Sequence, residues 1–171
     1  YKIDSVRLSE TEYTYDGKQK TPSVTVTDTN GNTLREGTDY TVSYSKGRIN
    51  VGRYKVTVSY KGKFSGKDKL YFSIIPKSTQ ITGLEVSGNK LIVKMKKQAE
   101  KTTGYLIQYS TSSDFEKSVT ESVLIEGVKK TTKTIKDLAS GTRWYFRVCA
   151  VNDKNEKAFY SEWSDVKSVA I

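Results

Sequence analysis

The sequence predicts an all-β protein, made of two tandem β-sandwiches joined by a short linker that contains proline. Much of the 171-residue chain falls into short runs in which apolar and polar residues alternate, the pattern of half-buried strands. Turn sequences with Gly separate these runs, and Tyr, Thr, Ser and Val recur throughout. One alternating run ends at Pro76, which cannot donate to a β-ladder, so we place the boundary there.

We expect the first sandwich at residues 1–75, the linker at 76–78 and the second sandwich at 79–171. Because so few residues separate the flanking strands, the two sandwiches should touch and hold a restricted angle, as an extended pair. The chain begins in the middle of a pattern at Tyr1. We therefore expect a piece of a longer protein, whose other parts carry any export signal or wall anchor.

The first sandwich is predicted to contain five strands separated by turns with Asp-Gly and Asn-Gly pairs, which supply positive φ. These strands are expected at residues 3–8, 23–28, 40–45, 52–60 and 69–75. Three motifs each place a turn beside an aromatic residue that plugs the end of a sandwich: Tyr15-Asp16-Gly17, Gly37-Thr38-Asp39-Tyr40 and Asn50-Val51-Gly52 before a strand. With these motifs, residues 9–75 resemble an immunoglobulin-like repeat of surface and secreted proteins of Gram-positive bacteria.

The second sandwich is predicted to contain seven strands in about 90 residues, which suits a two-sheet sandwich. They are expected at residues 81–86, 90–96, 104–110, 119–125, 131–138, 142–152 and 166–171. The sixth strand is the most informative, because it alternates strictly after a Ser-Gly turn. Trp144, Phe146, Val148 and Ala150 share one face, and Tyr145, Arg147, Cys149 and Val151 share the other. We expect the first face to be buried and the second to be wet.

The run that begins at Leu138, LASGTRWYFRVCAVN, followed by YSEWS, resembles the F strand and the start of the G strand of a fibronectin type III domain. This is an immunoglobulin-like sandwich that bacteria string along extracellular proteins. The sequence departs from that family at two places. Met95 stands where Leu91 and Val93 would lead to a core Trp, and Trp144 stands where a corner Tyr is usual. We assign structural roles to Pro76, Met95, Leu138 and Trp144.

The YSEWS segment is also similar to the WSxWS box of cytokine receptors, whose aromatic rings interleave with arginines of the adjacent strand. This resemblance implies that Arg147 stacks on Trp163 and clips two strands together, a contact worth ~0.5–1 kcal/mol when exposed. The paired cysteines of those receptors are missing, and Tyr160 replaces the first Trp. A receptor function therefore does not follow.

Catalysis finds little support in the sequence. The chain has no His, which removes the commonest general base and metal ligand, and the single Cys149 permits no internal disulfide. Asp28, Asn30 and Asn32 alternate as in a calcium loop but lack the downstream Glu, so an ordinary turn is expected. We predict no catalytic residue, no metal site and no cofactor, and a role for Cys149 stays open.

The formal net charge is +10, shared evenly between the two sandwiches. Residues 1–75 hold 13 basic and 8 acidic residues, and the remainder holds 16 and 11, so each part carries +5. This even spread argues against a dedicated nucleic-acid groove. The densest clusters are Lys94, Lys96 and Lys97, then Lys129, Lys130, Lys133 and Lys136. Such lysines usually protect edge strands, and the alternative is weak adhesion to polyanions such as teichoic acids or sulfated glycans.

The function that these observations favour is that of a non-catalytic tandem module of a bacterial cell-surface or secreted protein, which serves as a spacer and an adhesion surface. The alternative is an accessory module, able to bind carbohydrate, of a secreted carbohydrate-active enzyme. Candidate ligand contacts are Tyr145, Arg147, Tyr160 and Trp163. We expect a monomer, extracellular or associated with the cell wall, whose partners are cell-wall or host glycans or surface proteins, with no specific nucleic acid and no insertion into a membrane.

Overall fold

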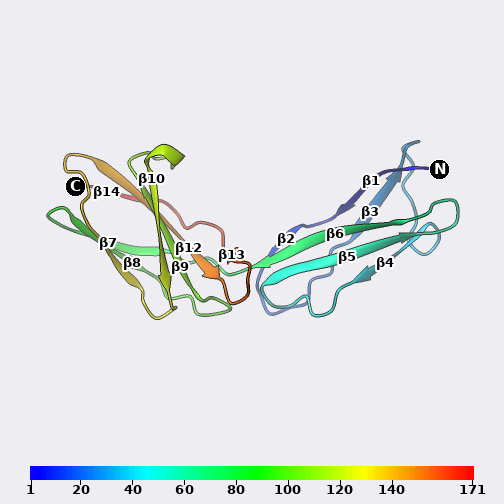
Figure 1. Ribbon diagram of the computed structural model, residues 1–171, viewed down its shortest axis with the longest axis horizontal. Coiled ribbons are helices and arrows are strands. Elements are labelled where there is room, and N and C mark those ends of the chain that lie inside the picture. Colours follow the sequence, from blue (N-terminus) through cyan, green and yellow to red (C-terminus); the bar gives the residue numbers. More distant parts are fainter. The chain divides into compact units, whose positions relative to one another are not determined.

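The computed structural model describes residues 1–171 and is built from β-strands and one short 3₁₀ helix (Figure 1). The prediction of an all-β protein is therefore confirmed. The chain divides into two compact units, Tyr1–Ile75 and Pro76–Ile171, which we call unit 1 and unit 2. None of its helices is long and apolar enough to cross a membrane.

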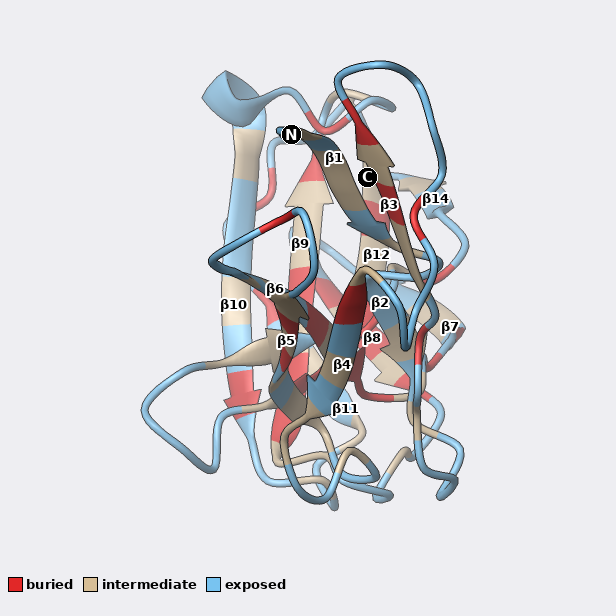
Figure 2. Ribbon diagram, turned by 90° about the vertical axis from the view of Figure 1, so that its right-hand side faces the viewer, coloured by how far each residue is buried: buried red, intermediate tan, exposed pale blue.

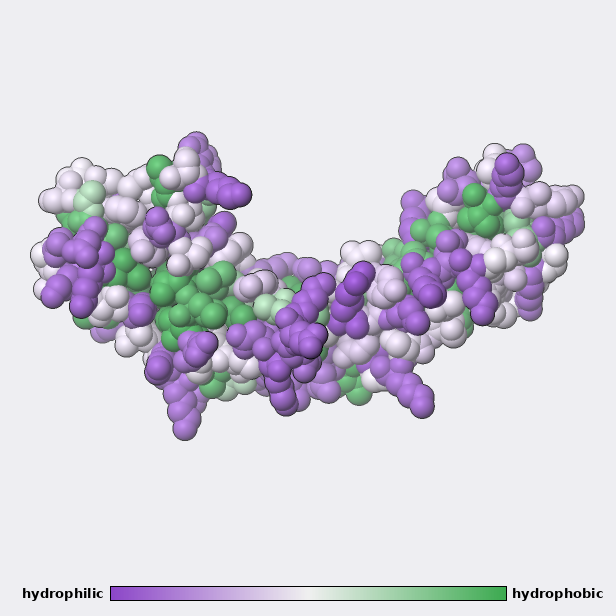
Figure 3. Space-filling view, viewed as in Figure 1, coloured by the Kyte–Doolittle hydropathy of each residue, from purple (hydrophilic) through white to green (hydrophobic).

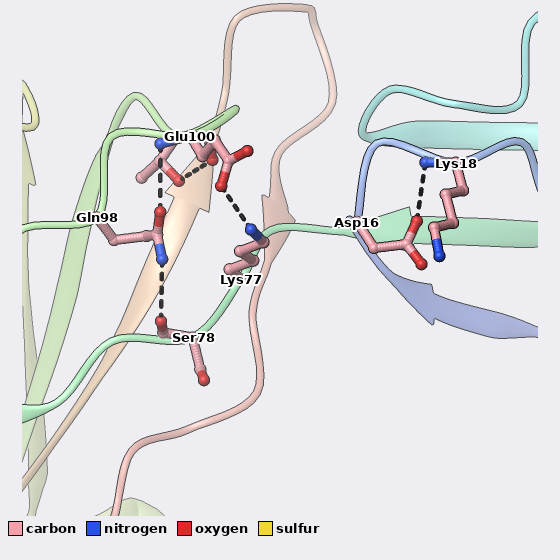
Figure 4. Close-up of polar contacts among 7 residues, drawn as sticks. Asp16, Lys18, Lys77, Ser78, Gln98 and Glu100 are labelled. Atoms are coloured by element: carbon pink, nitrogen blue, oxygen red, sulfur yellow. Dashed lines mark hydrogen bonds and ion pairs between the residues drawn. The ribbon is translucent and has the colours of Figure 1, made fainter.

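Residues expected as a linker are tied into unit 2. Pro76 is buried, and the Lys77 ammonium lies 2.5 Å from a carboxylate oxygen of Glu100. The side-chain amide of Gln98 donates to the carbonyl of Ser78 at 3.4 Å (Figure 4). These contacts hold the start of unit 2 against the loop that follows its second strand.

Unit 1 consists of two sheets. A two-stranded antiparallel sheet pairs β1 (Ile3–Leu8) with β3 (Val24–Asp28). A four-stranded sheet has the order β2-β6-β5-β4, with bounds Glu12–Thr14, Lys67–Ile75, Gly52–Tyr60 and Tyr40–Tyr44. All five predicted strands are present within two residues of their expected ends. The sequence pattern missed β2, a three-residue strand that runs parallel to β6.

The core of unit 1 lies between its two sheets, because alternate residues of each strand face inward. The side chains of Val26, Val56, Val58 and Ile74 are fully buried. Phe72 is 1% exposed, and the rings of Tyr13 and Tyr54 pack on it at centroid distances of 5.7 and 5.6 Å. Of the aromatic residues expected to plug the sandwich, Tyr40 is buried and Tyr15 packs on the edge of the core.

Unit 2 also consists of two sheets, one of three strands and one of five. The three-stranded sheet has the order β11-β8-β7, with bounds Thr132–Ile135, Lys90–Met95 and Ile81–Ser87. The five-stranded sheet has the order β10-β9-β12-β13, with bounds Thr120–Glu126, Gly104–Ser110, Arg143–Asn152 and Phe159–Tyr160. In the same sheet, β14 (Lys167–Ala170) pairs with the start of β12.

All seven predicted strands of unit 2 are present, although β11 is shorter than expected. Two elements were not predicted: the two-residue strand β13 and the 3₁₀ helix η1 (Lys117–Val119). Both are short segments, of two and three residues, in which apolar and polar residues do not alternate. Their backbone conformation is therefore decided by tertiary contacts rather than by local pattern.

The core of unit 2 is filled from both sheets, and its positions are coloured red in Figure 2. It includes Leu91, Val93 and Met95 of β8, Tyr105 and Ile107 of β9, and Phe146 and Val148 of β12. Met95 is 4% exposed, so a flexible thioether fills the space that the fibronectin pattern gives to Trp. Leu138 is also 4% exposed and belongs to the same core.

Trp144 lies at the rim of this core, partly buried, and its ring packs near that of Tyr109 at a centroid distance of 6.0 Å. Its indole Nε1–H donates to the carbonyl of Ala139, five residues upstream, at 3.3 Å. A corner tyrosine makes the same kind of bond back to the chain through its hydroxyl. Trp144 therefore supplies a corner hydrogen bond by different chemistry.

The second face of β12 differs from expectation. We expected it to be wet, but Cys149 and Val151 are each 1% exposed. Cys149 does point away from the core, opposite Phe146 and Val148. Two larger side chains flank it on this face and shield it from solvent: Leu106, its cross-strand partner, and Arg147, two residues earlier on the same strand. The outward face is thus a second packed layer rather than a solvated surface.

Candidate interaction site around Arg147

Arg147 occupies the middle of β12 and points outward from the five-stranded sheet. Its guanidinium carbon lies 4.4 Å from the centroid of the Trp163 ring, as the WSxWS resemblance implies. It also lies 4.1 Å from the centroid of the Phe115 ring, a contact that the sequence did not reveal. Two aromatic rings therefore hold one planar cation, the arrangement that favours Arg over Lys.

Gln108 completes the surroundings of this cation. Gln108 is the cross-strand partner of Arg147 on β9, and its Oε1 accepts hydrogen bonds from Nε and one Nη of the guanidinium at 2.9 and 2.7 Å. All the groups that hold Arg147 are neutral. Burial lowers the pKa of the guanidinium from its usual range, because the charged form loses hydration without gaining a carboxylate.

Trp163 is placed by the segment Tyr160–Ser164, which we call the clip. Ser161 and Ser164, each 6% exposed, bond to β12 through both backbone and side chain. Their hydroxyls accept the N–H groups of Ala150 and Val148 at 2.8 and 3.0 Å, and their own N–H groups donate to the carbonyls of the same two residues. The serine spacing of three residues thus fixes the clip along the strand, with Trp163 between the serines.

Phe115 reaches Arg147 from the loop between β9 and η1. It is 9% exposed and has φ of 55°, a conformation that a bulky residue rarely adopts. A hydrogen bond from its N–H to the carbonyl of Ser112, at 3.1 Å, closes the turn. The packing of the buried ring against the guanidinium compensates the energetic cost of this strained backbone conformation.

A hollow of about 330 Å³ opens beside the stack. Its lining combines two cations with amide and hydroxyl groups and one ring: Gln108, Phe115, Lys117, Thr120, Ser122 and Arg147. Along the same face, Leu124 of β10 lies opposite Leu106 of β9 and is 46% exposed. Figure 3 shows a hydrophobic patch over β9, β10 and β12. The face therefore offers an apolar surface next to a polar, cationic hollow.

The structure brings together two of the four predicted ligand contacts. Arg147 and Trp163 form the stack, whereas Tyr145 lies on the same face next to Ser110 and Ser168 and is half-buried. Tyr160 pairs with Val151 at the far end of β12 and is 49% exposed, outside the stack. Phe115 and Gln108 were missed, because only strand register and loop conformation bring them to Arg147.

Residues 28–32, whose sequence superficially resembles a calcium loop, form a turn that is held by hydrogen bonds among its own residues. The Asp28 carboxylate accepts the backbone N–H groups of Asn30 and Asn32, both at 2.9 Å, and the side-chain amide of Asn32 at 3.1 Å. These bonds lower the pKa of Asp28 below its usual value. Gly31 takes the positive φ of 82° that the turn requires. No group of three or more Cys, Asp or Glu side chains is arranged to hold a metal ion.

The fold and the clip define a tandem immunoglobulin-like β-sandwich protein, and family models agree. A model of the fibronectin type III domain matches residues 74–167, more than half of the chain, so this protein belongs to the fibronectin type III family. A model of the MBG domain matches residues 2–73. The predicted order, an immunoglobulin-like repeat and then a fibronectin type III domain, is thereby confirmed. No curated protein sequence matches the chain.

Several solved structures are similar in fold at low sequence identity. A cytokine receptor complex is 13% identical, with a TM-score of 0.52 over 97% of this chain and 96% of the other. The FN1–FN3 domains of chicken CNTN1 are 16% identical, with a TM-score of 0.47 over 99% of this chain and 66% of the other. A myokine structure is 14% identical, with a TM-score of 0.43 over 55% of this chain and 94% of the other. Domains of these two families are typically non-catalytic modules for spacing or interaction.

Proposed function

We propose that this chain is a non-catalytic tandem module of a bacterial cell-surface or secreted protein, where it serves as a spacer and as an adhesion or interaction surface. The observation that carries the proposal is the outward face of the five-stranded sheet in unit 2. This face carries both a cation with only neutral partners, Arg147 on β12, and, two strands away on β10, the exposed side chain of Leu124. A sandwich used only as a spacer has no need of either feature.

Covering the exposed apolar side chains of this face would remove them from water and so favour binding of a partner. Each Å² of apolar surface that a partner covers contributes roughly 25 cal/mol to the free energy of binding. A partner that also presents an anion would give Arg147 and Lys117 a negatively charged partner, whereas within unit 2 Arg147 bonds only to the neutral amide oxygen of Gln108. Partners of this chemistry include cell-wall or host glycans and surface proteins.

The alternative role in a secreted carbohydrate-active enzyme depends on a bare aromatic platform for sugars. Arg147 occupies one face of the Trp163 ring and one face of the Phe115 ring. Tyr145 is half-buried on the strand. The rings thus serve to hold the guanidinium, which favours the adhesion role over the sugar platform.

The location is tested by fractionating the source cells and identifying, with an antibody and mass spectrometry, the longer polypeptide that carries this segment. We expect the polypeptide in the cell-wall or secreted fraction, together with further sandwich modules. Peptides of a catalytic domain on the same polypeptide would instead make these modules an appendage of an enzyme. A polypeptide confined to the cytoplasm would contradict the proposal.

The interaction surface is tested with beads coated with the chain, on immobilised cell wall and on host-cell surface extracts. Leu124→Ser should reduce bead binding several-fold, because it removes the exposed apolar side chain that edge strand β10 contributes to the face. Val86→Ser is the matched control, since Val86 is 43% exposed on β7 in the other sheet. Equal loss in both variants, or no binding by the unmodified chain, would count against this face.

A further inference from the structure

The outward face of the four-stranded sheet in unit 1 carries a row of cations. Strands β5 and β6 each contribute two of them, all exposed: Arg53, Lys55, Lys67 and Lys69. Figure 3 shows hydrophilic side chains gathered over these two strands. We propose that this face binds a sulfated polysaccharide, which deepens the proposed function by giving the interaction module one class of ligand.

The register of the two strands places the four cations on one face. Lys55 pairs with Tyr71, Lys69 pairs with Thr57, Lys67 pairs with Ser59 and Arg53 pairs with Ser73. Neighbours along a strand on one face are about 7 Å apart, and diagonal neighbours on adjacent strands are about 7–8 Å apart. The row Lys67, Lys69, Lys55, Arg53 therefore crosses the sheet diagonally in three steps of similar length.

These four charges have no carboxylate partners. The ion pairs of unit 1 include only the bond between Lys20 and Asp16. Asp68, on β6, points to the opposite face, where it accepts the hydroxyl of Tyr60 at 2.6 Å. The one carboxylate on the outward face is Glu12 of β2, next to Ser73 and two strands away from Arg53. The face thus presents a uniform positive field, which attracts a flexible polyanion.

The rest of the face selects the kind of polyanion. It is rich in hydroxyl groups that can bond to those of sugars: Thr41, Ser43, Thr57, Ser59 and Ser73. Its one exposed aromatic residue, Tyr71, is covered by the Arg53 guanidinium at 3.9 Å from the ring centroid. Single-stranded nucleic acid needs bare rings for its bases, and a membrane surface needs apolar side chains to insert. A sulfated polysaccharide needs neither.

The lysines of unit 2 that are clustered in the sequence do not form a comparable row on a sheet face. Lys94 forms an ion pair with Glu85 across β7 and β8. Lys96 and Lys97 follow β8, and Lys129 and Lys130 precede β11, so they belong to loops rather than to a sheet face. They provide a matched control with the same number of charges.

The experiment compares the binding of three full chains to immobilised heparin at fixed salt. The face variant carries R53Q, K55Q, K67Q and K69Q, and the control carries K96Q, K97Q, K129Q and K130Q; both have a net charge four lower than the unmodified chain. We expect the face variant to bind about tenfold more weakly or worse, since four exposed charge contacts are lost. The control should change less than about twofold. Circular dichroism establishes that both variants fold.

Equal loss in the two variants, or no retention of the unmodified chain, would overturn the proposal. Soluble competitors that displace the chain from heparin distinguish a sulfated polysaccharide from other polyanions. Dextran sulfate should displace the chain from heparin, whereas uncharged dextran should not. If single-stranded DNA or inorganic polyphosphate of equal charge displaces it better than dextran sulfate does, the face is not a site for sulfated polysaccharide. None of these outcomes bears on the location of the parent protein or on the Leu124 face, so the proposed function is tested separately.

Discussion

The side chain of Arg147 is held by two rings and one amide oxygen, so its shape matters as much as its charge. Arg147→Lys keeps the charge but loses the paired bonds to Gln108 and the planar stacking. We expect a loss of about 1–2 kcal/mol in the free energy of unfolding, measured by urea denaturation. Arg143→Lys, at an exposed position on the same strand, should change it by less than about 0.5 kcal/mol. Equal effects of both substitutions would show that the stack contributes nothing.

Cys149 provides a prediction that depends on pH. Burial raises the pKa of its thiol from 9.0 to about 12. Above pH 9 the thiol therefore ionises in the unfolded chain but not in the folded one. Its contribution to stability is complete below pH 9 and is lost as the pH rises toward 12, by about 1.4 kcal/mol per pH unit.

The measurement is the difference in unfolding free energy between the unmodified chain and Cys149→Ala, followed from pH 8 to pH 11. Several tyrosines also have raised pKa values because of burial, but their effect cancels in this difference. We expect the difference to fall as the pH rises. A thiol reagent at pH 8 should modify Cys149 only after unfolding. Rapid reaction in the folded state, or a difference independent of pH, would show that the thiol is accessible.

Among the elements of unit 2, the clip depends on two serine hydroxyls that satisfy buried backbone donors. Ser164→Ala leaves the N–H of Val148 without its hydroxyl acceptor, and Ser161→Ala does the same to Ala150. We expect each substitution to cost about 1–3 kcal/mol in urea unfolding. Ser87→Ala, at an exposed position on β7, is the control and should be nearly neutral. If the clip variants match this control, water replaces the hydroxyls and the clip is not structural.

The elements also show what the sequence could predict and why. Strands with an apolar residue at every second position, such as β5, β9 and β12, were predicted to within a residue, because the pattern itself indicates which face is buried. Strands β2 and β13 were missed, since two or three residues carry no period. The outward face of β12 was expected to be wet because alternation cannot show that a loop ring, Phe115, and a clip ring, Trp163, pack onto it.

The charged sites show the same limit. Clusters of lysine that are close in the sequence, such as Lys94, Lys96 and Lys97, can be recognised from the sequence alone. The sequence does not show the row on β5 and β6, because Lys55 and Lys69 lie 14 positions apart in the chain and become diagonal neighbours only through the register of the hairpin. Pairing between strands, rather than proximity in the chain, determines where charge collects on a β-sandwich.

At the scale of the whole molecule, the buried residues form separate cores in the two units. Val58 is fully buried in the core of unit 1, and Ile107 is fully buried in the core of unit 2. Each side chain is surrounded by residues of its own unit, so a cavity at either position removes packing from that unit. Ile107→Ala should cost about 2–5 kcal/mol, and Val58→Ala somewhat less because it removes fewer atoms.

Residue-resolved hydrogen exchange distinguishes local from shared stability, because it reports the free energy of opening at each amide. We expect Ile107→Ala to reduce protection throughout β8, β9 and β12 while β5 and β6 keep theirs, and Val58→Ala to give the reciprocal result. The two variants are matched controls for one another, since each leaves one core intact. Protection that fell by the same amount in both units, in either variant, would mean that the chain folds as one cooperative body despite having two cores.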